Sequence, residues 1–319
     1  MADNQSGEGG WERVVLEKVA LAAVTEQRRA RRWGIFFKLL IFGYLFAILF
    51  IAMGWVGKKD SYPAKHTALV EVNGVIATGS PASAEAVIDG LTAAYKDKRT
   101  QGIILRINSP GGSPVQSGNL NDEIRRLRAK YPDIPLHAVV EDVCASGGYY
   151  VAVAADKIFV NKASMIGSIG VLMNGFGFTG AMEKLGVERR LLAAGENKGF
   201  LDPFSPLNDE QSRHAKEMLG EVHAQFIDVV RKGRGKRLKE TPDMFSGLIW
   251  VGQKSIELGL ADALGSAEQV ARDVIKAEDI VDFTQRENVA ERFAKRFGAS
   301  MAESLVKLGA GGTFNFQLR

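Results

Sequence analysis

The chain has 319 residues, with 41 Lys and Arg against 37 Asp and Glu, which gives a net charge of +4 and a pI near 9.0. Residues 1–60 hold nine basic and six acidic side chains and the other 259 residues hold 32 and 31, so a general nucleic-acid-binding domain is not expected. A hydrophobic share of 46% excludes a disordered or fibrous chain, and a single cysteine excludes a disulfide framework or a multi-cysteine zinc site.

The first predicted element is a membrane-spanning helix over residues 33–57. Residues 39–56 carry no charge, and only Lys38 interrupts the longer stretch, where a spanning helix needs about 20 apolar residues. Trp33 and Trp55 fall near its two ends, as interfacial aromatic residues do. The alternative is a buried core helix. A secretory signal peptide is disfavoured, because the stretch begins more than 30 residues into the chain and no small-x-small site follows it.

The charges that flank this stretch predict its orientation. Four arginines lie within residues 28–32, whereas only Lys58 and Lys59 follow. The positive-inside rule therefore places a tail of residues 1–32 in the cytoplasm and the remainder of the chain on the other side. In a bacterium, this predicts a single-pass protein of the inner membrane whose main body is periplasmic or extracytoplasmic. The arginines then report topology rather than a nucleic-acid partner.

After a linker over residues 58–66, short β-branched runs alternate with helical stretches. The predicted strands are Ala68–Val72, Gly102–Ile107, Leu136–Glu141, Lys157–Asn161 and Ser168–Leu172. The predicted helices are Ser83–Lys96, Pro114–Lys130, Ser146–Ala155, Asn208–Lys232, Gly252–Leu258 and Ala267–Lys276. Strands that alternate with helices predict an α/β fold with mostly parallel pairing, as one compact domain over residues 67–277.

The C-terminal part, residues 278–319, is predicted to be an amphipathic helix and a tail. Apolar residues recur at a helical period between residues 286 and 308, with charges between them. Such a helix could pack on a neighbouring subunit, lie on the membrane or close its own domain. The basic run over residues 231–239 is interpreted as a solvated helix end, with a contact to anionic lipid or substrate as the alternative.

Two glycine pairs follow predicted strands, each at the point where a strand gives way to a helix. Gly111 and Gly112 end the segment INSPGG, and Gly147 and Gly148 follow Ser146 in CASGGYY. Glycine permits positive φ and close approach of another chain, and the free N–H groups at a helix start can hold an oxyanion. Ser146 therefore suits an acyl-transfer nucleophile. Neither pair matches a phosphate-binding loop, and the alternative is a purely structural turn.

The base that a serine nucleophile needs is not evident as a histidine. His66, His137, His214 and His223 are interpreted as packed or surface side chains, since none completes a Ser-His-Asp arrangement. A desolvated lysine can serve instead, because burial disfavours the ammonium form. From chemistry alone, Lys198 is one candidate among many lysines, and Glu196 nearby argues for a charged amine. Cys144 is interpreted as a small buried residue beneath the turn.

Five ordered segments of the chain together resemble the signal peptide peptidase A family, also called protease IV (serine peptidase family S49). They are INSPGG (107–112), SPVQSG (113–118), ASGGYYVA (145–152), ADKIFVNKASMIGSIGV (155–171) and GENKGFLDPFSPL (195–207). The resemblance covers most of residues 67–277 and matches the short form with one catalytic domain. It implies the crotonase/Clp-protease-like fold of repeated β-β-α units.

The resemblance also implies the roles of individual residues. Ser146 would be the nucleophile, Lys198 the general base, and Ser168 would hydrogen-bond the lysine amine and orient it. Gly147 and either Gly111 or Gly112 would line the oxyanion hole. No cofactor and no metal are implied. Family members assemble into dome-like homo-oligomeric rings, in which the serine and lysine of one site come from neighbouring subunits of the short forms.

The function that follows is a membrane-anchored serine endopeptidase with a Ser-Lys dyad. Its expected substrates are remnant signal peptides and other hydrophobic peptides, after signal peptidase has released them, and its expected surroundings are the lipid bilayer and further copies of itself. Three alternatives remain open. They are an acyl-CoA hydratase or isomerase of the same fold, a SohB-like membrane peptidase with another substrate, and a catalytically inactive membrane scaffold.

Overall fold

The computed structural model describes residues 9–52 and 63–286 of the chain. The described residues fall into two units, namely helix α1 (Gly9–Ala52) and the compact unit Tyr62–Arg286. Each unit is considered by itself.

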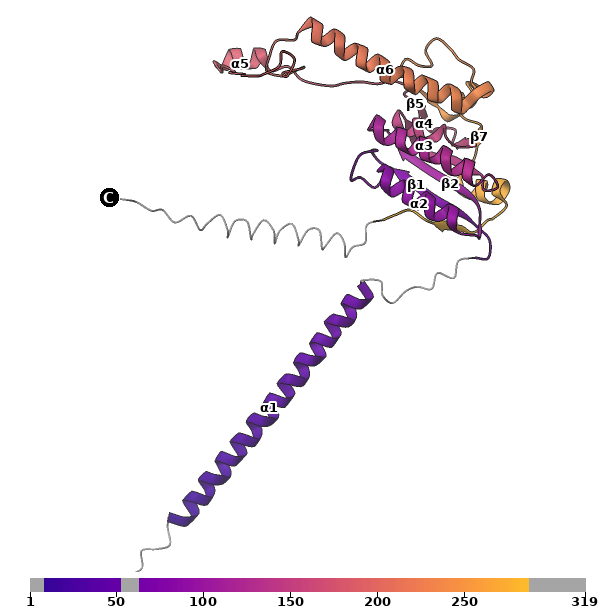
Figure 1. Cartoon of the computed structure of the whole chain (residues 1–319). Coiled ribbons are helices and arrows are strands. Elements are labelled where there is room, and N and C mark those ends of the chain that lie inside the picture. Colours follow the sequence, from indigo (N-terminus) through magenta and orange to yellow (C-terminus); the bar gives the residue numbers. More distant parts are fainter. Residues whose placement is uncertain (1–8, 53–62, 287–319) are drawn as a thin grey trace, which may run out of the picture. The chain divides into compact units, whose positions relative to one another are not determined.

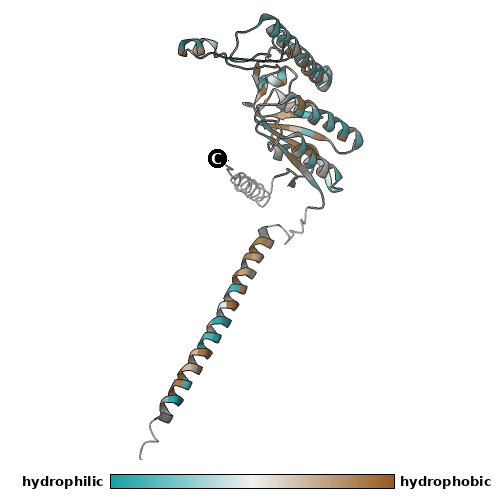
Figure 2. Ribbon diagram, turned by 60° about the vertical axis from the view of Figure 1, so that its left-hand side comes forward, coloured by the Kyte–Doolittle hydropathy of each residue, from teal (hydrophilic) through white to brown (hydrophobic). Residues whose placement is uncertain are grey.

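Helix α1 is long and apolar enough to cross a membrane. Its 44 residues extend over about 66 Å at 1.5 Å per residue, about twice the thickness of a hydrocarbon core. The most apolar 18-residue window has a mean hydropathy of 2.1, and none of that window is buried. Figure 2 shows the apolar colour concentrated toward the Ala52 end of the helix. The helix begins at Gly9, so it includes most of the predicted tail, while positions 53–57 of the predicted span lie outside the described residues.

The compact unit is an α/β fold built on one sheet. The strands are β1 (His66–Asn73), β2 (Thr100–Ser109), β3 (Leu136–Ala145), β4 (Lys157–Val160), β5 (Met165–Gly167), β6 (Ile249–Val251), β7 (Ala263–Leu264) and β8 (Ile280–Asp282). Along the main path the order is β6-β5-β3-β2-β1-β8, with β4 bridging β3 and β7. All pairs are parallel except β5 with β6.

The helices include the six that the sequence predicts, in the predicted order, and one that it does not, α5. They are α2 (Ala84–Lys96), α3 (Pro114–Lys130), α4 (Gly147–Ala152), α5 (Thr179–Leu185), α6 (Asp209–Arg234), α7 (Gly252–Glu257) and α8 (Ala267–Gln269), which continues as a π-helix over Val270–Ile275. Helices α2 and α3 lie over one face of β1 and β2 (Figure 1). Ser113 begins α3 by accepting a hydrogen bond from the Gln116 N–H, with Pro114 as the first helical residue.

Strands β1 and β2 are each followed by a short extended segment before the next helix, whereas β3 leads into α4 through Ser146 alone. Ile76 after β1 and Gly112 after β2 form an isolated parallel bridge. The first half of β3 pairs with β4 through residues 137–139, whereas its second half pairs with β5 through residues 143–145. This is the repeated β-β-α unit that the resemblance implies. Strand β3 thus changes partner from β4 to β5 along its length, and Ser146 follows directly after the part that pairs with β5.

The core lies on both faces of the sheet. The main cluster joins alternate residues of the strands, such as Val70, Leu105 and Ala138, to the apolar sides of α2, α3, α4 and α6. A smaller cluster on the other face packs residues such as Ile104 and Val139 against α8 and its π-helical continuation. Because the first halves of the strands are buried on both faces, their sequences are almost continuously apolar.

Several elements differ from the predicted ones. The predicted strand Ser168–Leu172 is wrong, because the strand β5 precedes it and ends at Gly167. Gly167 and Ser168 both have positive φ, 115° and 51°, and strand geometry cannot continue through them. Helix α4 is shorter than predicted and ends at Ala152. Strand β8 lies within the stretch expected to be C-terminal helix and tail, and the predicted amphipathic helix itself lies outside the described residues.

Candidate active site

Ser146 occupies a sharp turn between β3 and α4. Its φ and ψ are 51° and −122°, a region that non-glycine residues rarely adopt. Its N–H donates to the Gly167 carbonyl at 2.8 Å, and its carbonyl accepts from the Tyr150 N–H at 3.0 Å. Such backbone strain costs about 1–3 kcal/mol and is found at functional sites, where it presents a side chain in a fixed direction.

Glycine is required on both sides of this turn. A Cβ on Gly111, whose φ is +97°, would lie 2.6 Å from the Gly147 nitrogen and 2.8 Å from the Ser146 Cβ. A Cβ on Gly112 would lie 2.1 Å from the Ile76 carbonyl oxygen, and one on Gly147 would lie 2.4 Å from the Ser117 Oγ. The segments 109–113 and 145–148 therefore pack backbone against backbone, which explains why both carry glycine pairs.

The backbone N–H groups of the three glycines differ in whether they already have an acceptor. Gly111 donates its N–H to the Ser109 hydroxyl at 3.1 Å, and that hydroxyl donates to the Gly74 carbonyl at 2.6 Å. Within residues 63–286, the structure describes no acceptor for the N–H groups of Gly112 and Gly147. The Gly112 nitrogen lies 3.2 Å from where a Cβ of Gly147 would stand, so these two donors are adjacent. Of the three predicted glycines, Gly112 and Gly147 are thus suited to hold an oxyanion.

Ser168 lies beside the same turn. It follows Gly167, whose carbonyl binds the Ser146 N–H, and its own N–H donates to the Leu248 carbonyl at 2.7 Å. Its φ of 51° equals that of Ser146. Ser146 and Ser168, both with positive φ, thus follow the ends of the neighbouring strands β3 and β5.

A cavity of about 510 Å³ contains both serines. Its lining includes Gly112, Ser117, Ser146, Gly147, Ser168 and Gly247, together with the apolar or aromatic side chains Tyr150, Val171, Leu172, Val222 and Phe226. A lining that combines a few polar groups with apolar side chains is typical of a site that binds an apolar chain next to reacting atoms.

Lys198 is placed away from this cavity within the single chain. It lies in a loop between α5 and α6, is exposed, and is not among the cavity-lining residues. We call the segment over residues 172–207 the arm. Figure 1 shows α5, which belongs to the arm, beyond one end of α6 and away from α4. The chain thus brings together Ser146, Ser168 and the glycines, but not Lys198.

The arm exposes an unusual amount of apolar surface. Its large apolar side chains that are more than 40% exposed are Leu172, Met173, Phe176, Phe178, Leu185, Val187, Leu191, Leu192, Phe204 and Leu207. Leu192 is 97% exposed. Exposed apolar side chains concentrated in one segment in this way indicate a protein or membrane interaction site.

The histidines and the cysteine lie outside the cavity. His66 and His137 are buried in the sheet, and His214 makes an edge contact with Phe200. His223 places its Nε2 3.1 Å from the Ile169 carbonyl oxygen. Cys144 is fully buried, and burial raises the pKa of its thiol, which keeps it protonated. Among the described residues, no group of His, Cys, Asp and Glu side chains is arranged to hold a metal.

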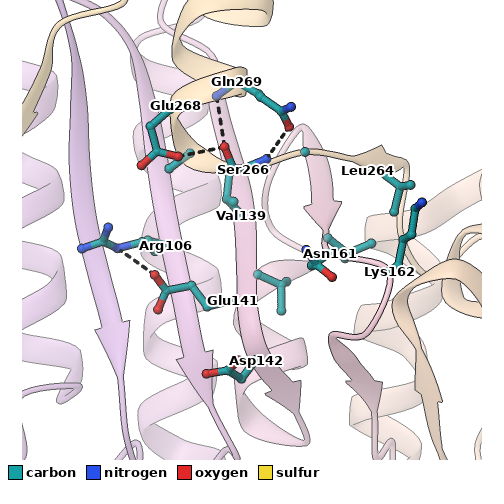
Figure 3. Close-up of a pocket in the computed structure, with 14 residues that line it drawn as sticks. Arg106, Val139, Glu141, Asp142, Asn161, Lys162, Leu264, Ser266, Glu268 and Gln269 are labelled. Atoms are coloured by element: carbon teal, nitrogen blue, oxygen red, sulfur yellow. Dashed lines mark hydrogen bonds and ion pairs between the residues drawn. The ribbon is translucent and has the colours of Figure 1, made fainter.

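A second cavity, of about 700 Å³, lies on the opposite face of the sheet (Figure 3). Two of its charged groups are paired with each other: Arg106 contacts Glu141 at 3.5 Å and also binds Glu71. Ser266 and Gln269 form the capping box that begins α8. None of the predicted catalytic residues lines this cavity.

Comparison with known proteins decides the family. The model of peptidase family S49 matches residues 128–280, which include Ser146, Ser168 and Lys198. A Synechocystis protein named as a candidate protease is 31% identical over 204 residues, which are 64% of this chain and 71% of that protein. The chain belongs to peptidase family S49. Its α/β sheet with β-β-α units and one N-terminal apolar helix confirms the predicted fold class.

Other relatives are longer than the matched part. An Enterococcus faecium protein named as a candidate signal peptide peptidase, SppA, is 32% identical over 59% of this chain and 54% of that protein. A Brucella melitensis protein named Na(+)/H(+) antiporter NhaA is 44% identical over 62% of this chain. The chain spans only 27% of the length of that Brucella protein, so its name describes a much larger molecule.

Some features of the candidate site could not be predicted from the sequence. Ser109 and Ser117 were visible only as parts of a motif, yet both are fully buried and their hydroxyl groups border the glycine packing. The contribution of α6 through Val222 and Phe226 was also missed, because that helix follows the turn by some 60 residues. A helical stripe of apolar residues was the one available signal, and it indicates burial rather than a site.

Proposed function

We propose that the protein is a serine endopeptidase in which Ser146 is the nucleophile and Lys198 the general base. The observation that carries this proposal is the strained Ser146 beside the adjacent N–H groups of Gly112 and Gly147, in a cavity with apolar walls. Membership of family S49 supports it, as do the protease names of two relatives.

The proposed reaction proceeds in two steps. In the first, the Ser146 Oγ bonds to the carbonyl carbon of a peptide, and its proton passes to the neutral Nζ of Lys198. The N–H groups of Gly112 and Gly147 stabilise the oxyanion, and the C–N bond breaks as Nζ returns the proton to the leaving amine. In the second step, water loses a proton to Nζ and attacks the acyl ester, and the ester C–O bond breaks as Nζ passes that proton to the Ser146 Oγ, which releases the peptide acid and restores both side chains. Ser168 is proposed to accept a hydrogen bond from the amine and orient it.

Lys198 is proposed to reach Ser146 across an interface between copies of the chain. A lysine base must be uncharged when it accepts a proton, which requires that its ammonium form be desolvated. Lys198 is exposed in the single chain, so another surface must cover it. The apolar side chains of the arm, which include the nearly fully exposed Leu192, favour association with a second copy. Repetition of that contact would close a homo-oligomeric ring.

The proposed substrates are hydrophobic peptides at a membrane, in particular remnants of signal peptides released by signal peptidase. Tyr150, Val222 and Phe226 give the cavity the apolar walls that such chains would contact. Helix α1 is proposed to span the bacterial inner membrane with the chain's first residues in the cytoplasm, because four arginines precede its apolar part. That orientation holds the peptidase unit on the extracytoplasmic side.

The direct test is hydrolysis of a fluorogenic hydrophobic peptide by the full chain in detergent micelles. We expect Ser146→Ala and Lys198→Ala each to lower kcat/KM by about a thousandfold or more. A fluorophosphonate probe should label the wild-type protein and not Ser146→Ala. Turnover that persists in either variant would refute the dyad, and a wild-type protein that neither turns over nor becomes labelled would favour the inactive scaffold.

Co-expression of the two inactive variants tests whether the dyad forms between copies. In a mixed ring, a site is intact when its serine comes from the Lys198→Ala chain and its lysine from the Ser146→Ala chain. Random mixing makes about a quarter of the sites intact, so activity should return to about that fraction of wild type. If the dyad forms within one chain, no mixture recovers activity.

A further inference from the structure

Helix α6 runs along the candidate active site. Val222, Gln225 and Phe226 from this helix line the cavity that holds Ser146 and Ser168. His223 lies between these lining residues and is half-buried without lining the cavity itself. Its side chain contacts the segment that carries Ser168.

His223 forms a hydrogen bond whose direction is determined by its partner. The Nε2 lies 3.1 Å from the Ile169 carbonyl oxygen, which belongs to a residue 54 positions earlier in the chain. A carbonyl oxygen can only accept, so Nε2 must carry the hydrogen and donate. Ile169 is fully buried, so this carbonyl would pay a desolvation penalty without a donor.

The segment 168–170 depends on a small number of such attachments. The Ser168 N–H donates to the Leu248 carbonyl, and the Gly170 N–H donates back to the Ser168 carbonyl at 2.9 Å. The Ile169 side chain is inserted into the main core. Ser168 itself has a φ of 51°, which a serine keeps only where its surroundings hold it. His223 provides the attachment from the α6 side.

We infer that His223 is a positioning residue for Ser168. It holds the Ile169 carbonyl and thereby keeps the Ser168 hydroxyl aligned toward the cavity. This inference rests on the proposed function, in which Ser168 orients the Lys198 amine. A misplacement of about 1 Å in such a group lowers the rate of the chemical step strongly while leaving substrate binding nearly unchanged.

The first experiment measures peptide hydrolysis by the full chain with His223→Leu and His223→Gln. Leucine removes the donor, whereas the amide nitrogen of glutamine can take the place of Nε2. We expect His223→Leu to lower kcat about tenfold with KM within about twofold of wild type, and His223→Gln to recover most of the loss. Glu221→Gln, at an exposed position of the same helix, is the matched control and should retain wild-type kcat.

A double-mutant cycle with Ser168→Ala tests whether His223 acts through Ser168. If it does, His223→Leu should lower kcat by less than about twofold once the Ser168 hydroxyl is absent, because the effects of coupled residues are not additive. An undiminished tenfold effect in the Ser168→Ala background would overturn the inference. So would a His223→Leu variant with wild-type kcat.

A loss of folding is distinguished by a third variant. If His223→Leu fails to fold, His223→Gln is compared with His223→Asn, whose shorter amide cannot reach the Ile169 carbonyl. Equal kcat in these two variants would overturn the inference, whereas a higher kcat for glutamine supports it. Failure of the proposed function has a different signature, since Ser146→Ala would then be as active as wild type or the wild-type protein would be inactive.

Discussion

The segments that carry Ser146 and Lys198 differ in how firmly the rest of the molecule holds them. Ser146 lies between the buried strand β3 and the buried helix α4, and backbone hydrogen bonds fix it on both sides. Lys198 lies on the arm, which is held mainly by its own contacts. Phe178 stacks on Phe204 at 5.3 Å, and the Leu201 N–H donates to Gln211 at the start of α6.

This difference suits a site of which one part forms when the chain folds and the other part, in the proposed function, when copies of the chain associate. The half of the site around Ser146 is complete in one folded chain, because the same packing that stabilises the sheet also sets the turn. The arm around Lys198 has a defined local structure but apolar side chains that the other described residues leave exposed. In the proposed function, a second copy of the chain supplies Lys198 to the site around Ser146. Perturbations of the two segments should therefore have different consequences.

The largest difference is expected between glycines of the two segments. Gly112→Ala should lower the free energy of unfolding by about 3 kcal/mol or more and hydrolysis more than a hundredfold, because its Cβ would lie 2.1 Å from the Ile76 carbonyl oxygen. Gly180→Ala in α5 meets no atom within 4 Å and should leave the unfolding free energy unchanged or slightly higher. Denaturant unfolding of the full chain in detergent measures both. Equal effects would contradict the comparison.

Ion pairs of the two regions provide the next test. Arg234 is 1% exposed and donates to both oxygens of Asp262, at 2.8 and 2.9 Å. Asp262→Asn should destabilise the fold by about 3–5 kcal/mol, because it leaves a buried guanidinium without its charge partner. On the arm, Asp202 binds Arg189 and Ser205. Asp202→Asn should change global unfolding little, since the arm lies apart from the core, and a large shift in its unfolding midpoint would show that arm and core unfold together.

Assembly should respond to the arm alone. Leu192→Asp places a charge on the most exposed apolar side chain of the arm, so it should dissociate oligomers and lower activity about tenfold or more without lowering the unfolding midpoint. The control is Val274→Asp, at an apolar residue that is 39% exposed in the π-helical continuation of α8, outside the arm. Sedimentation velocity in detergent reports the mass. An unchanged mass for Leu192→Asp would remove the arm from the interface.

The fold could be predicted to a large extent because its signals are local. The strand β2 and the helix α3 are bounded by a turn, a capping serine and a proline, and each of these acts within a few residues. The strand predicted at Ser168 was wrong for a tertiary reason. Its β-branched residues favour extended structure, yet the hydrogen bonds of Ser146 and Ser168 to Gly167 and Leu248 impose positive φ there.

The candidate site could be predicted only in its motif positions. Ser146 and the glycines were visible because a close backbone approach excludes other residues, which leaves a trace in the sequence. The choice between Gly111 and Gly112 as donor depends on the Ser109 hydroxyl, which occupies one of the two N–H groups. The hydrogen bond of His223 joins positions 54 residues apart, and nothing local in either segment indicates it.

The smallest predicted effect concerns His137, which is buried in the sheet, where a positive charge is unfavourable. Burial lowers the pKa of His137, with Lys157 and Arg128 adding to the effect of burial and Asp156 opposing it. The folded protein therefore binds this proton less readily than the unfolded chain, whose histidine titrates near 6.5. Stability from this residue is complete above that pH and declines as pH falls below it.

Between pH 7.5 and 5.5, wild type should lose more unfolding free energy than His137→Gln, as denaturant titration at both pH values would measure. Equal losses of unfolding free energy in the two proteins would mean that the imidazole is protonated in the folded state, and hence that water reaches His137 within the sheet.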